Sequence, residues 1–203
     1  MENDSVEEAF EFLSSIETNP TTSILYRQVE NALNAIINHP QTCKNSIVGI
    51  QNTLILNTIT PQDTVILNSF VITSAHYITN LTSSALETLL EVYAMLAPNP
   101  SFNDSFYKSH LIDFLIKGIK EGSLSFFNNE TAVILLSSLI DIVEGIHAER
   151  VHLLLPEIKE LLGSTGTLTV LVSMARYATS NERAMRLVQY FDSIAMEEKD
   201  IDL

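Results

Sequence analysis

Cysteine is nearly absent from this sequence, because its 203 residues contain only Cys43. One thiol cannot form an intramolecular disulfide, so the fold has to be held by its apolar core. The N-terminus also lacks the basic start, apolar run and small-residue cleavage site of a secretion signal. We therefore expect an intracellular, reducing location, either cytoplasmic or nuclear.

Basic residues are scarce as well: there are 11 Lys and Arg against 25 Asp and Glu, and the formal net charge is −14. This charge repels nucleic-acid phosphates and anionic membrane surfaces at long range, and the few basic residues are scattered along the chain. We expect no nucleic-acid partner and no membrane partner.

Long apolar runs are also missing. The most apolar stretch, 132–146, is interrupted by two serines and two acids: Ser137, Ser138, Asp141 and Glu144. A helix that spans a bilayer needs about 20 predominantly apolar residues. No transmembrane helix is predicted.

Catalytic motifs are missing too, since the sequence has no glycine-rich phosphate loop and no serine elbow. His39 and Cys43 are close in sequence, but Pro40 between them favours a turn over a helix face that would pair them. His147 and His152 are five residues apart, whereas a helical metal pair needs a spacing of about three or four. We predict that the protein is not an enzyme and holds no cofactor or metal.

The sequence does contain a succession of helix-length apolar stripes, with no strand-like alternation between them. Each stripe follows a Ser, Thr, Asp or Asn that suits a helix N-cap. The stripes predict an all-α protein of about ten helices. The predicted helices cover, approximately, residues 5–19, 22–39, 42–57, 60–78, 84–97, 104–121, 132–146, 148–162, 167–178 and 181–196.

Several of these helices have distinct start and stop signals. The segment Thr60-Pro61-Gln62-Asp63 offers a cap hydroxyl, a proline at the first position and an acid near the positive end of the helix dipole. Ser84 with Glu87 has the spacing of a capping box and predicts the start of the fifth helix. Asp104 is expected to begin a single helix that Gly122 ends.

The C-terminal half has its own features. The helix over 132–146 is apolar almost all round, so we expect it at the centre of the array, contacted on several sides. Pro156 inside the next helix predicts a kink or a late start, and Gly163 and Gly166 mark the gap that follows. The expected core face of the last helix is Ala184, Leu187, Val188, Phe191 and Ile194.

Helices taken in pairs repeat about every forty residues. The pairs start near Ser5, Cys43, Ser83, Asn129 and Ser164. In this period and pairing the chain resembles the armadillo/HEAT-type α-solenoid superfamily over nearly its whole length. The resemblance implies antiparallel helix pairs stacked as a short α-solenoid, while the loop lengths also suit an irregular helical bundle. We expect one helical-repeat domain over 1–203, with any subdivision near 97–104.

Charge is distributed unevenly along the chain. Residues 1–30 hold seven acids against Arg27 alone. Residues 31–102 hold only four charges, which are Lys44, Asp63, Glu87 and Glu91. Their polar positions are Asn, Ser, Thr and Gln, which enter an interface at a lower desolvation cost than Lys or Glu. The pattern favours an interface on the second to fifth helices, although compositional drift toward Asn, Ile and Thr produces the same pattern without one.

Stacked helices without catalytic motifs are typical of proteins that bind other proteins. We therefore expect a non-catalytic protein–protein interaction module, a scaffold or adaptor, that binds a peptide or a helix of its partner on a concave helical surface. The alternative is a self-associating structural subunit whose charge-poor residues 31–102 form a homo-oligomer interface.

The armadillo-like resemblance implies that Asn side chains on inner helices hold the main chain of a bound peptide. Asn34 and Asn68 fall on the second helices of the first two predicted pairs, and His76 is close by in the sequence. Lys108 and Arg183 would suit a groove that binds an acidic peptide, although such residues are also common on plain solvated faces. The candidate partner-binding residues are Arg27, Asn34, Asn68, His76, Lys108 and Arg183.

Overall fold

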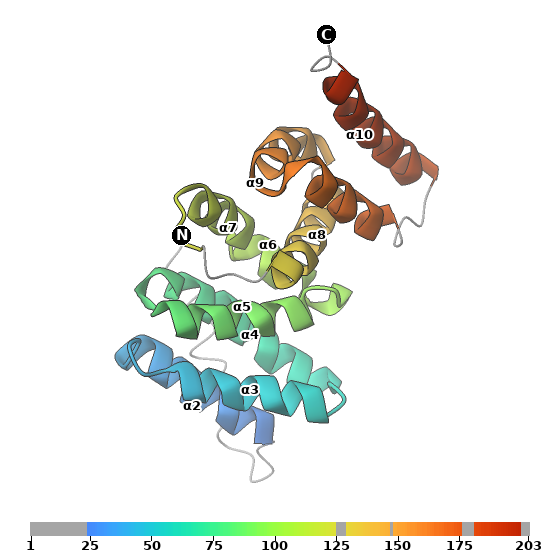
Figure 1. Cartoon of the computed structure of the whole chain (residues 1–203). Helices are drawn as coiled ribbons and strands as arrows, with labels where there is room; N and C mark the ends of the chain where they lie inside the picture. The colour runs from blue at the N-terminus through green and yellow to red at the C-terminus, as the bar shows by residue number, and fades with distance from the viewer. Residues whose placement is uncertain (1–23, 125–128, 147, 176–180, 200–203) are drawn as a thin grey trace. The chain divides into compact units, whose positions relative to one another are not determined.

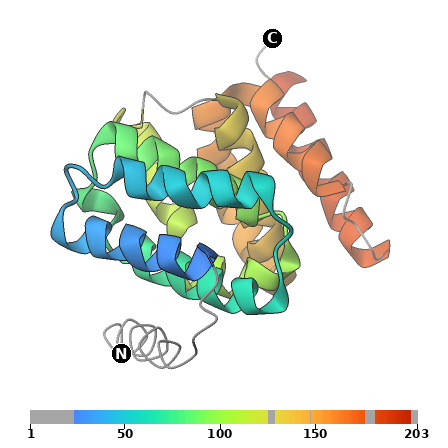
Figure 2. The same ribbon diagram turned by 90° about the horizontal axis from the view of Figure 1, so that it is seen from below.

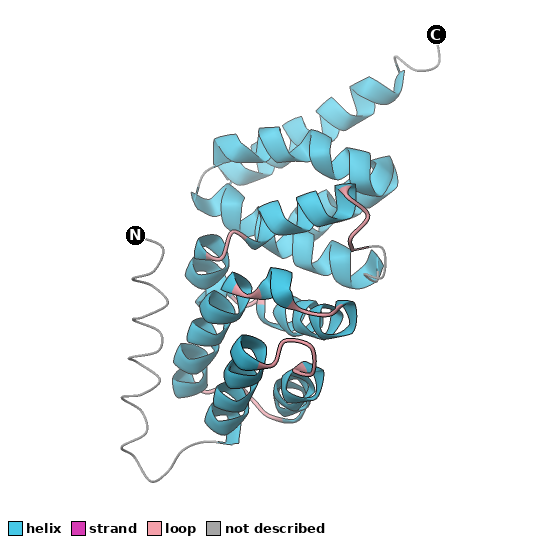
Figure 3. Cartoon of the chain, turned by 90° about the vertical axis from the view of Figure 1, so that its left-hand side faces the viewer, coloured by secondary structure: helices cyan, strands magenta, loops and turns pink. Residues whose placement is uncertain are grey.

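The computed structural model describes residues 24–124, 129–146, 148–175 and 181–199. These ranges consist of helices joined by short loops, and no β-strand occurs in them (Figure 3). The prediction of an all-α protein is confirmed. The helix predicted over 5–19 lies outside the described residues. By its contacts the chain separates into two compact units, Met1–Leu111 and Ile112–Leu203.

Unit 1 contains α2 (Ile24–Asn38), α3 (Lys44–Leu56), α4 (Pro61–His76), α5 (Ser83–Leu96) and α6 (Asn103–Lys108), with 3-10 turns at Ile78–Asn80 and Pro100–Phe102. Helix α2 packs against α3 and α4, α3 packs against α5, and α4 packs against α6. Figures 1 and 2 show α2, in blue, alongside α3, in cyan. The contacts place α2, α4 and α6 in one row and α3 and α5 in another. A helical bundle fits this arrangement, and the solenoid remains a prediction.

Unit 1 is held by an apolar core to which every helix contributes. On α2, Leu25, Val29, Leu33 and Ile36 recur every three or four positions and are all buried. Full burial of one such side chain stabilises the fold by roughly 1.5–3 kcal/mol. Because the opposite side of α2 is exposed, this periodicity fixes which of its polar residues face solvent.

Tyr93 is the largest fully buried side chain of α5. Its ring meets that of Phe106 edge to face, with centroids 5.6 Å apart. Its hydroxyl shares a hydrogen bond of 2.7 Å with the Ser74 hydroxyl of α4. Burial raises the pKa of Tyr93, because a phenolate there would lose its water. Tyr93 therefore connects α5 to both α4 and α6.

Helix α4 begins as the sequence predicts. The Thr60 hydroxyl accepts a hydrogen bond from the backbone N–H of Asp63 at 3.2 Å, and the Asp63 carboxylate accepts one from the backbone N–H of Thr60 at 3.0 Å. Pro61 occupies the first turn, where no hydrogen bond is lost. The prediction of this helix start is confirmed.

Helix α5 begins two residues earlier than predicted. Its N-cap is Thr82, whose backbone is extended and whose hydroxyl accepts from the N–H of Ala85 at 3.4 Å. Ser84 lies inside the first turn, and its carbonyl accepts from the Thr88 hydroxyl at 3.0 Å. The prediction of Ser84 as the cap is wrong, because three consecutive hydroxyl residues are all suitable and the backbone conformation selects among them.

The single helix predicted from Asp104 to Gly122 is also wrong. The chain forms α6 and then α7 (Leu111–Lys120), with His110 between them in the left-handed region at φ 51°. Such a residue ends a helix, and Gly or Asn usually occupies the position. Because a histidine occupies this position here, the break could not be predicted from the residue type. Gly122 does lie just beyond α7, at φ 70°.

Unit 2 contains α7 apart from its first residue, α8 (Asn129–Ile146), α9 (Ala148–Ala175) and α10 (Asn181–Lys199). Helix α9 packs against both α8 and α10. The buried residues of α8 are Leu135, Leu136, Ser137, Leu139, Ile140, Ile142 and Val143. They cover most of the helix circumference, although Ile134 is exposed. None of the helices in the described ranges combines the length and the apolarity of a bilayer span.

Helix α9 is two helices joined at Gly163, whose backbone leaves helical values at φ 67° and ψ 176°. The predicted boundary at this glycine is therefore confirmed. The Thr167 hydroxyl donates to the Gly163 carbonyl at 2.8 Å, which ties the second half to the junction. Pro156 lies inside the first half, and the helix starts at Ala148. The late start offered for Pro156 is wrong, and the change of direction belongs to Gly163.

Helix α10 buries only part of the predicted face, and the Ile194 side chain of that face lies outside the described residues. Leu187 and Tyr190 are buried, whereas Ala184 and Val188 are exposed. The prediction is wrong for these two residues, because the helix is rotated so that the large ring of Tyr190 is inside. An aromatic ring buries more area than Ala or Val, and this difference decides the rotation.

Candidate functional site

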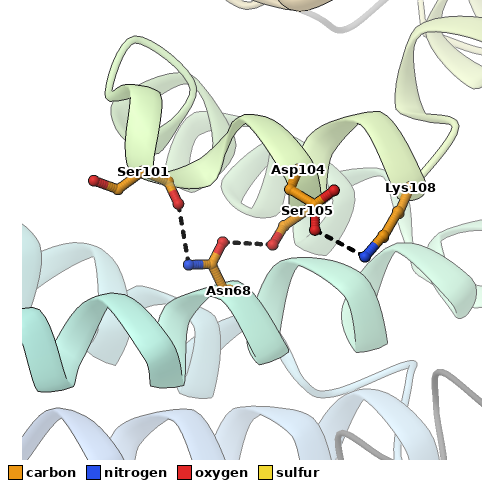
Figure 4. Close-up of polar contacts among 5 residues, drawn as sticks. All are labelled: Asn68, Ser101, Asp104, Ser105 and Lys108. Carbon is orange, nitrogen blue, oxygen red and sulfur yellow. Dashed lines mark hydrogen bonds and ion pairs between the residues drawn. The ribbon is translucent and has the colours of Figure 1, made fainter. Parts of the chain in front are cut away.

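Asn68 lies where α4 packs against α6 (Figure 4). Its amide nitrogen donates to the carbonyl oxygens of Thr64, at 2.9 Å, and of Ser101, at 3.2 Å. Its amide oxygen accepts from the Ser105 hydroxyl. Both ends of the amide are therefore occupied inside unit 1, where they join α4 to the start of α6. The Asn68 amide therefore has a role in the fold, and few of its hydrogen-bonding groups remain for a ligand.

Lys108 projects from α6, one turn beyond Ser105 (Figure 4). Its ammonium group lies 2.8 Å from the carboxylate of Asp104, and both side chains are largely exposed. An acid four residues before a base on a helix is the favourable order, but an exposed pair contributes less than about 1 kcal/mol. The structure brings Lys108 close to Asn68, and it also brings an acid close to Lys108.

Arg27 and Asn34 both lie on the exposed side of α2. The amide nitrogen of Asn38 donates to the amide oxygen of Asn34 at 2.6 Å. Among the described residues no further partner meets the two N–H donors of Asn34 or the amide oxygen of Asn38. An exposed Asn pair of this kind presents donors and an acceptor side by side, which are the groups that a peptide main chain needs.

His76 and Arg183 lie away from these clusters. His76 is the last residue of α4, is exposed, and meets the Tyr77 ring edge to face at 5.4 Å. The Arg183 side chain lies outside the described residues. Of the predicted set, the structure thus groups Arg27 with Asn34 on α2 and Asn68 with Lys108 at the contact of α4 with α6.

Cys43 and His39, which are close in sequence, lie in different surroundings. The Cys43 thiol is buried and donates to the Pro40 carbonyl at 3.3 Å. Burial raises the pKa of this thiol, which lowers the fraction of reactive thiolate. His39 is exposed in the turn that Pro40 predicted. Nowhere in the described ranges do three His, Cys, Asp or Glu residues gather as metal ligands would.

The sequence interpretation missed a set of exposed apolar side chains around the end of the α2–α3 hairpin. They are Ile24 at 75% exposure, Ile55 at 66%, Leu56 at 80% and Val65 at 45%. A signal was present, because three consecutive apolar residues in the last turn of α3, 54–56, cannot all face one core. We name this set the end patch.

Comparison of the chain with protein-family models, with curated proteins and with solved structures finds no match. The resemblance to armadillo/HEAT-type solenoids therefore remains a prediction from helix spacing. What the protein does has to be inferred from its own described surfaces.

Proposed function

We propose that this chain is a non-catalytic protein–protein interaction module that binds a peptide or a helix of a partner on a helical surface. The exposed side of α2, with Arg27, Asn34 and Asn38, is the binding surface in this proposal. The observation that carries it is the exposed Asn34–Asn38 amide pair, whose remaining donors and acceptor have no partner among the described residues.

The amide pair suits an extended peptide. A peptide main chain presents one N–H and one C=O at each residue, and an Asn side chain can bind both groups. The hydrogen bond between Asn34 and Asn38 holds the two amides in a fixed relation, one helical turn apart. Main-chain recognition of this kind does not depend on the peptide's side chains, so neighbouring residues have to supply specificity.

Arg27 is suited to supply part of that specificity. It lies about two helical turns before Asn34, on the same exposed side of α2, and it is the one basic residue in a strongly acidic N-terminal stretch. A guanidinium group pairs in bidentate fashion with a carboxylate. The proposed partner segment therefore carries an acidic residue within a few residues of the part held by the amides.

The underside of α2 makes this surface rigid. Val29, Ala32, Leu33 and Ile36 are almost completely buried against α3 and α4. A helix fixed in this way does not have to be ordered when the partner binds, so more of the contact energy remains as affinity.

Affinity purification with quantitative mass spectrometry tests the proposal. Wild-type chain, the double variant Asn34→Ala/Asn38→Ala and the single variant Arg27→Ala are expressed in the same cells. We expect the double variant to lose most of the captured partner without a change in melting temperature, because neither residue is buried. Arg27→Ala should weaken the same partner to a smaller extent.

Asn52 provides the matched control, since it is an exposed Asn on α3. Asn52→Ala should retain the partner at the wild-type level. Equal recovery of all proteins by wild type, the double variant and Arg27→Ala would contradict the proposed surface.

The charge-poor stretch 31–102 favours a second candidate, a self-associating structural subunit. This stretch forms α3, α4, α5 and the second half of α2, and three of the four residues of the end patch belong to it. Apolar side chains on a surface nearly free of charge are typical of the centre of an interface. The number of copies in solution decides between the two candidates.

A further inference from the structure

The break between α6 and α7 occurs without the residues that usually interrupt a helix. No glycine or proline lies between Asn103 and Lys117. His110, which separates the two helices, is in the left-handed region at φ 51°. This conformation is unfavourable for a residue with a Cβ, because the Cβ comes close to the following carbonyl oxygen. The local sequence therefore favours one continuous helix, and packing elsewhere in the fold opposes it.

The hydrogen bonds at the end of α6 differ from those of a continuous helix. The Ser109 hydroxyl donates to the Phe106 carbonyl at 2.7 Å. In a continuous helix this carbonyl would accept from the backbone N–H of His110, four residues along. That N–H lies 3.5 Å from the Tyr107 carbonyl instead, which is long for a hydrogen bond. Helical angles at His110 would restore the regular bond, and they would also give the first amides of α7 partners within the same helix.

The two helices are anchored unequally. Of its described side chains, α7 buries four apolar ones, which are Leu111, Ile112, Leu115 and Ile116. Helix α6 has six residues, and its buried side chains are Ser105 and Phe106. Because the removal of apolar area from water is the main favourable term in packing, α7 is held more firmly than α6. If His110 takes helical angles, α6 is thus the helix that leaves its place.

Two contacts keep α6 where it is. The Phe106 ring meets the Tyr93 ring of α5 edge to face, with centroids 5.6 Å apart. The Ser105 hydroxyl donates to the amide oxygen of Asn68 on α4 (Figure 4). Departure of α6 breaks both contacts. It also uncovers the amide oxygen of Asn68, which can then accept a hydrogen bond from another donor, such as a peptide N–H.

We propose that α6 is a conformational switch. In its minor state His110 takes helical angles, α6 leaves α4 and continues into α7 as one helix over 103–120, and the Asn68 amide oxygen is open to a partner. The two-helix form is the major state, because the burial of Phe106 and the bond to Asn68 outweigh the unfavourable backbone of His110. A partner that binds the uncovered Asn68 would shift the population toward the joined helix. This inference does not depend on the proposed surface of α2.

Relaxation-dispersion NMR on the full chain tests the switch, because it detects minor states that exchange in microseconds to milliseconds. We expect exchange at the backbone amides of residues 109–113, with a helical Cα chemical shift for His110 in the minor state. His110→Gly should lower the minor-state population at least about fivefold, since glycine takes positive φ without strain and is unfavourable inside a helix. His110→Ala should raise this population, because alanine has the opposite preferences.

Asn68→Ala tests the contact that holds α6. It removes the acceptor of the Ser105 hydroxyl, so the minor-state population should rise. Asn52→Ala is the matched control, since Asn52 is an exposed Asn on α3, and it should leave the exchange unchanged.

Three results would overturn the switch. The first is an absence of exchange at residues 109–113 in both the wild-type chain and His110→Ala. The second is a minor state in which the Cα shift of His110 is not helical. The third is a minor-state population that His110→Gly leaves unchanged. The proposed function has its own test in the capture experiment, so either proposal can fail while the other stands.

Discussion

Unit 1 and unit 2 use their polar side chains differently within the described residues. In unit 1, uncharged groups join one helix to another: Ser74 meets Tyr93, and Ser105 meets Asn68. In unit 2, opposite charges join two helices, as in Lys120 of α7 with Glu160 of α9 at 3.3 Å, whereas Lys108 and Asp104 of unit 1 pair within one helix. Buried neutral bonds are insensitive to salt, whereas exposed ion pairs are screened. The neutral contacts between helices of unit 1 should therefore respond less to salt than the ion pair between helices of unit 2.

The largest expected effect concerns Tyr93. Tyr93→Ala removes a fully buried ring between three helices, so we expect it to lower the free energy of unfolding by about 3–5 kcal/mol in urea titrations. Tyr93→Phe keeps the ring and loses the bond to Ser74 and the longer one to the Val71 carbonyl, so it should lower that free energy by about 1 kcal/mol. Equal effects of the two variants would show that the hydroxyl, and not the packing, holds these helices together.

The second-largest expected effect on the free energy of unfolding concerns Asn68. Asn68→Ala leaves the Ser101 carbonyl and the Ser105 hydroxyl without this partner, so we expect the free energy of unfolding to fall by about 1–3 kcal/mol. Asn34→Ala, on the exposed side of α2, should change it by less than about 0.5 kcal/mol. Chemical denaturation of the two variants side by side measures this difference. If Asn68→Ala were as mild as Asn34→Ala, Asn68 would be available for a partner after all.

Substitution of Thr73 is expected to stabilise the protein. Its hydroxyl is buried in unit 1 and has no hydrogen-bond partner in the described structure. Thr73→Val removes the unsatisfied hydroxyl with little change in volume, so we expect the free energy of unfolding to rise by about 1 kcal/mol. Thr88→Val should have the opposite sign, because the Thr88 hydroxyl donates to the Ser84 carbonyl. A loss of stability in Thr73→Val would indicate a bound water at this hydroxyl.

The smallest effect tests the ion pairs of unit 2. Glu182→Gln removes the partner of Arg186 one turn along α10, so we expect a loss of about 0.2–0.5 kcal/mol at low salt. The loss should disappear at about 1 M salt, where the screening length is about 3 Å. The Asn68→Ala effect should persist under the same conditions. A salt-dependent Asn68→Ala would break the distinction between the two units.

Local signals predicted the helices well. The start of α4 depends on Thr60, Pro61 and Asp63, which are neighbours in sequence, so the capping box could be predicted without tertiary information. The junction at Gly163 was predictable for the same reason, since glycine adopts positive φ without strain. His110 was not predictable, because a histidine reaches the left-handed region only when the surrounding structure requires it.

The candidate site was less predictable than the helices. Sequence placed Asn34 and Asn68 in equivalent positions on successive helix pairs. The structure separates them, since Asn34 bonds to a neighbour four residues away and remains exposed, whereas Asn68 bonds to Ser101, 33 residues away. The end patch was not predicted. The number of apolar residues that a helix end can bury depends on which other elements cover that end, and the sequence does not show them.

The amino-acid sequence alone is enough to predict that this protein is helical, where most of its helices lie, and that little of its negative charge falls in residues 31–102. These properties follow from neighbouring residues and from composition. The folded chain was needed to show which Asn is used inside the fold, which residues of α10 are buried, and which apolar side chains are left in water. Those outcomes depend on contacts between residues far apart in the chain, where a rotation of one helix by a single residue exchanges a buried side chain for an exposed one.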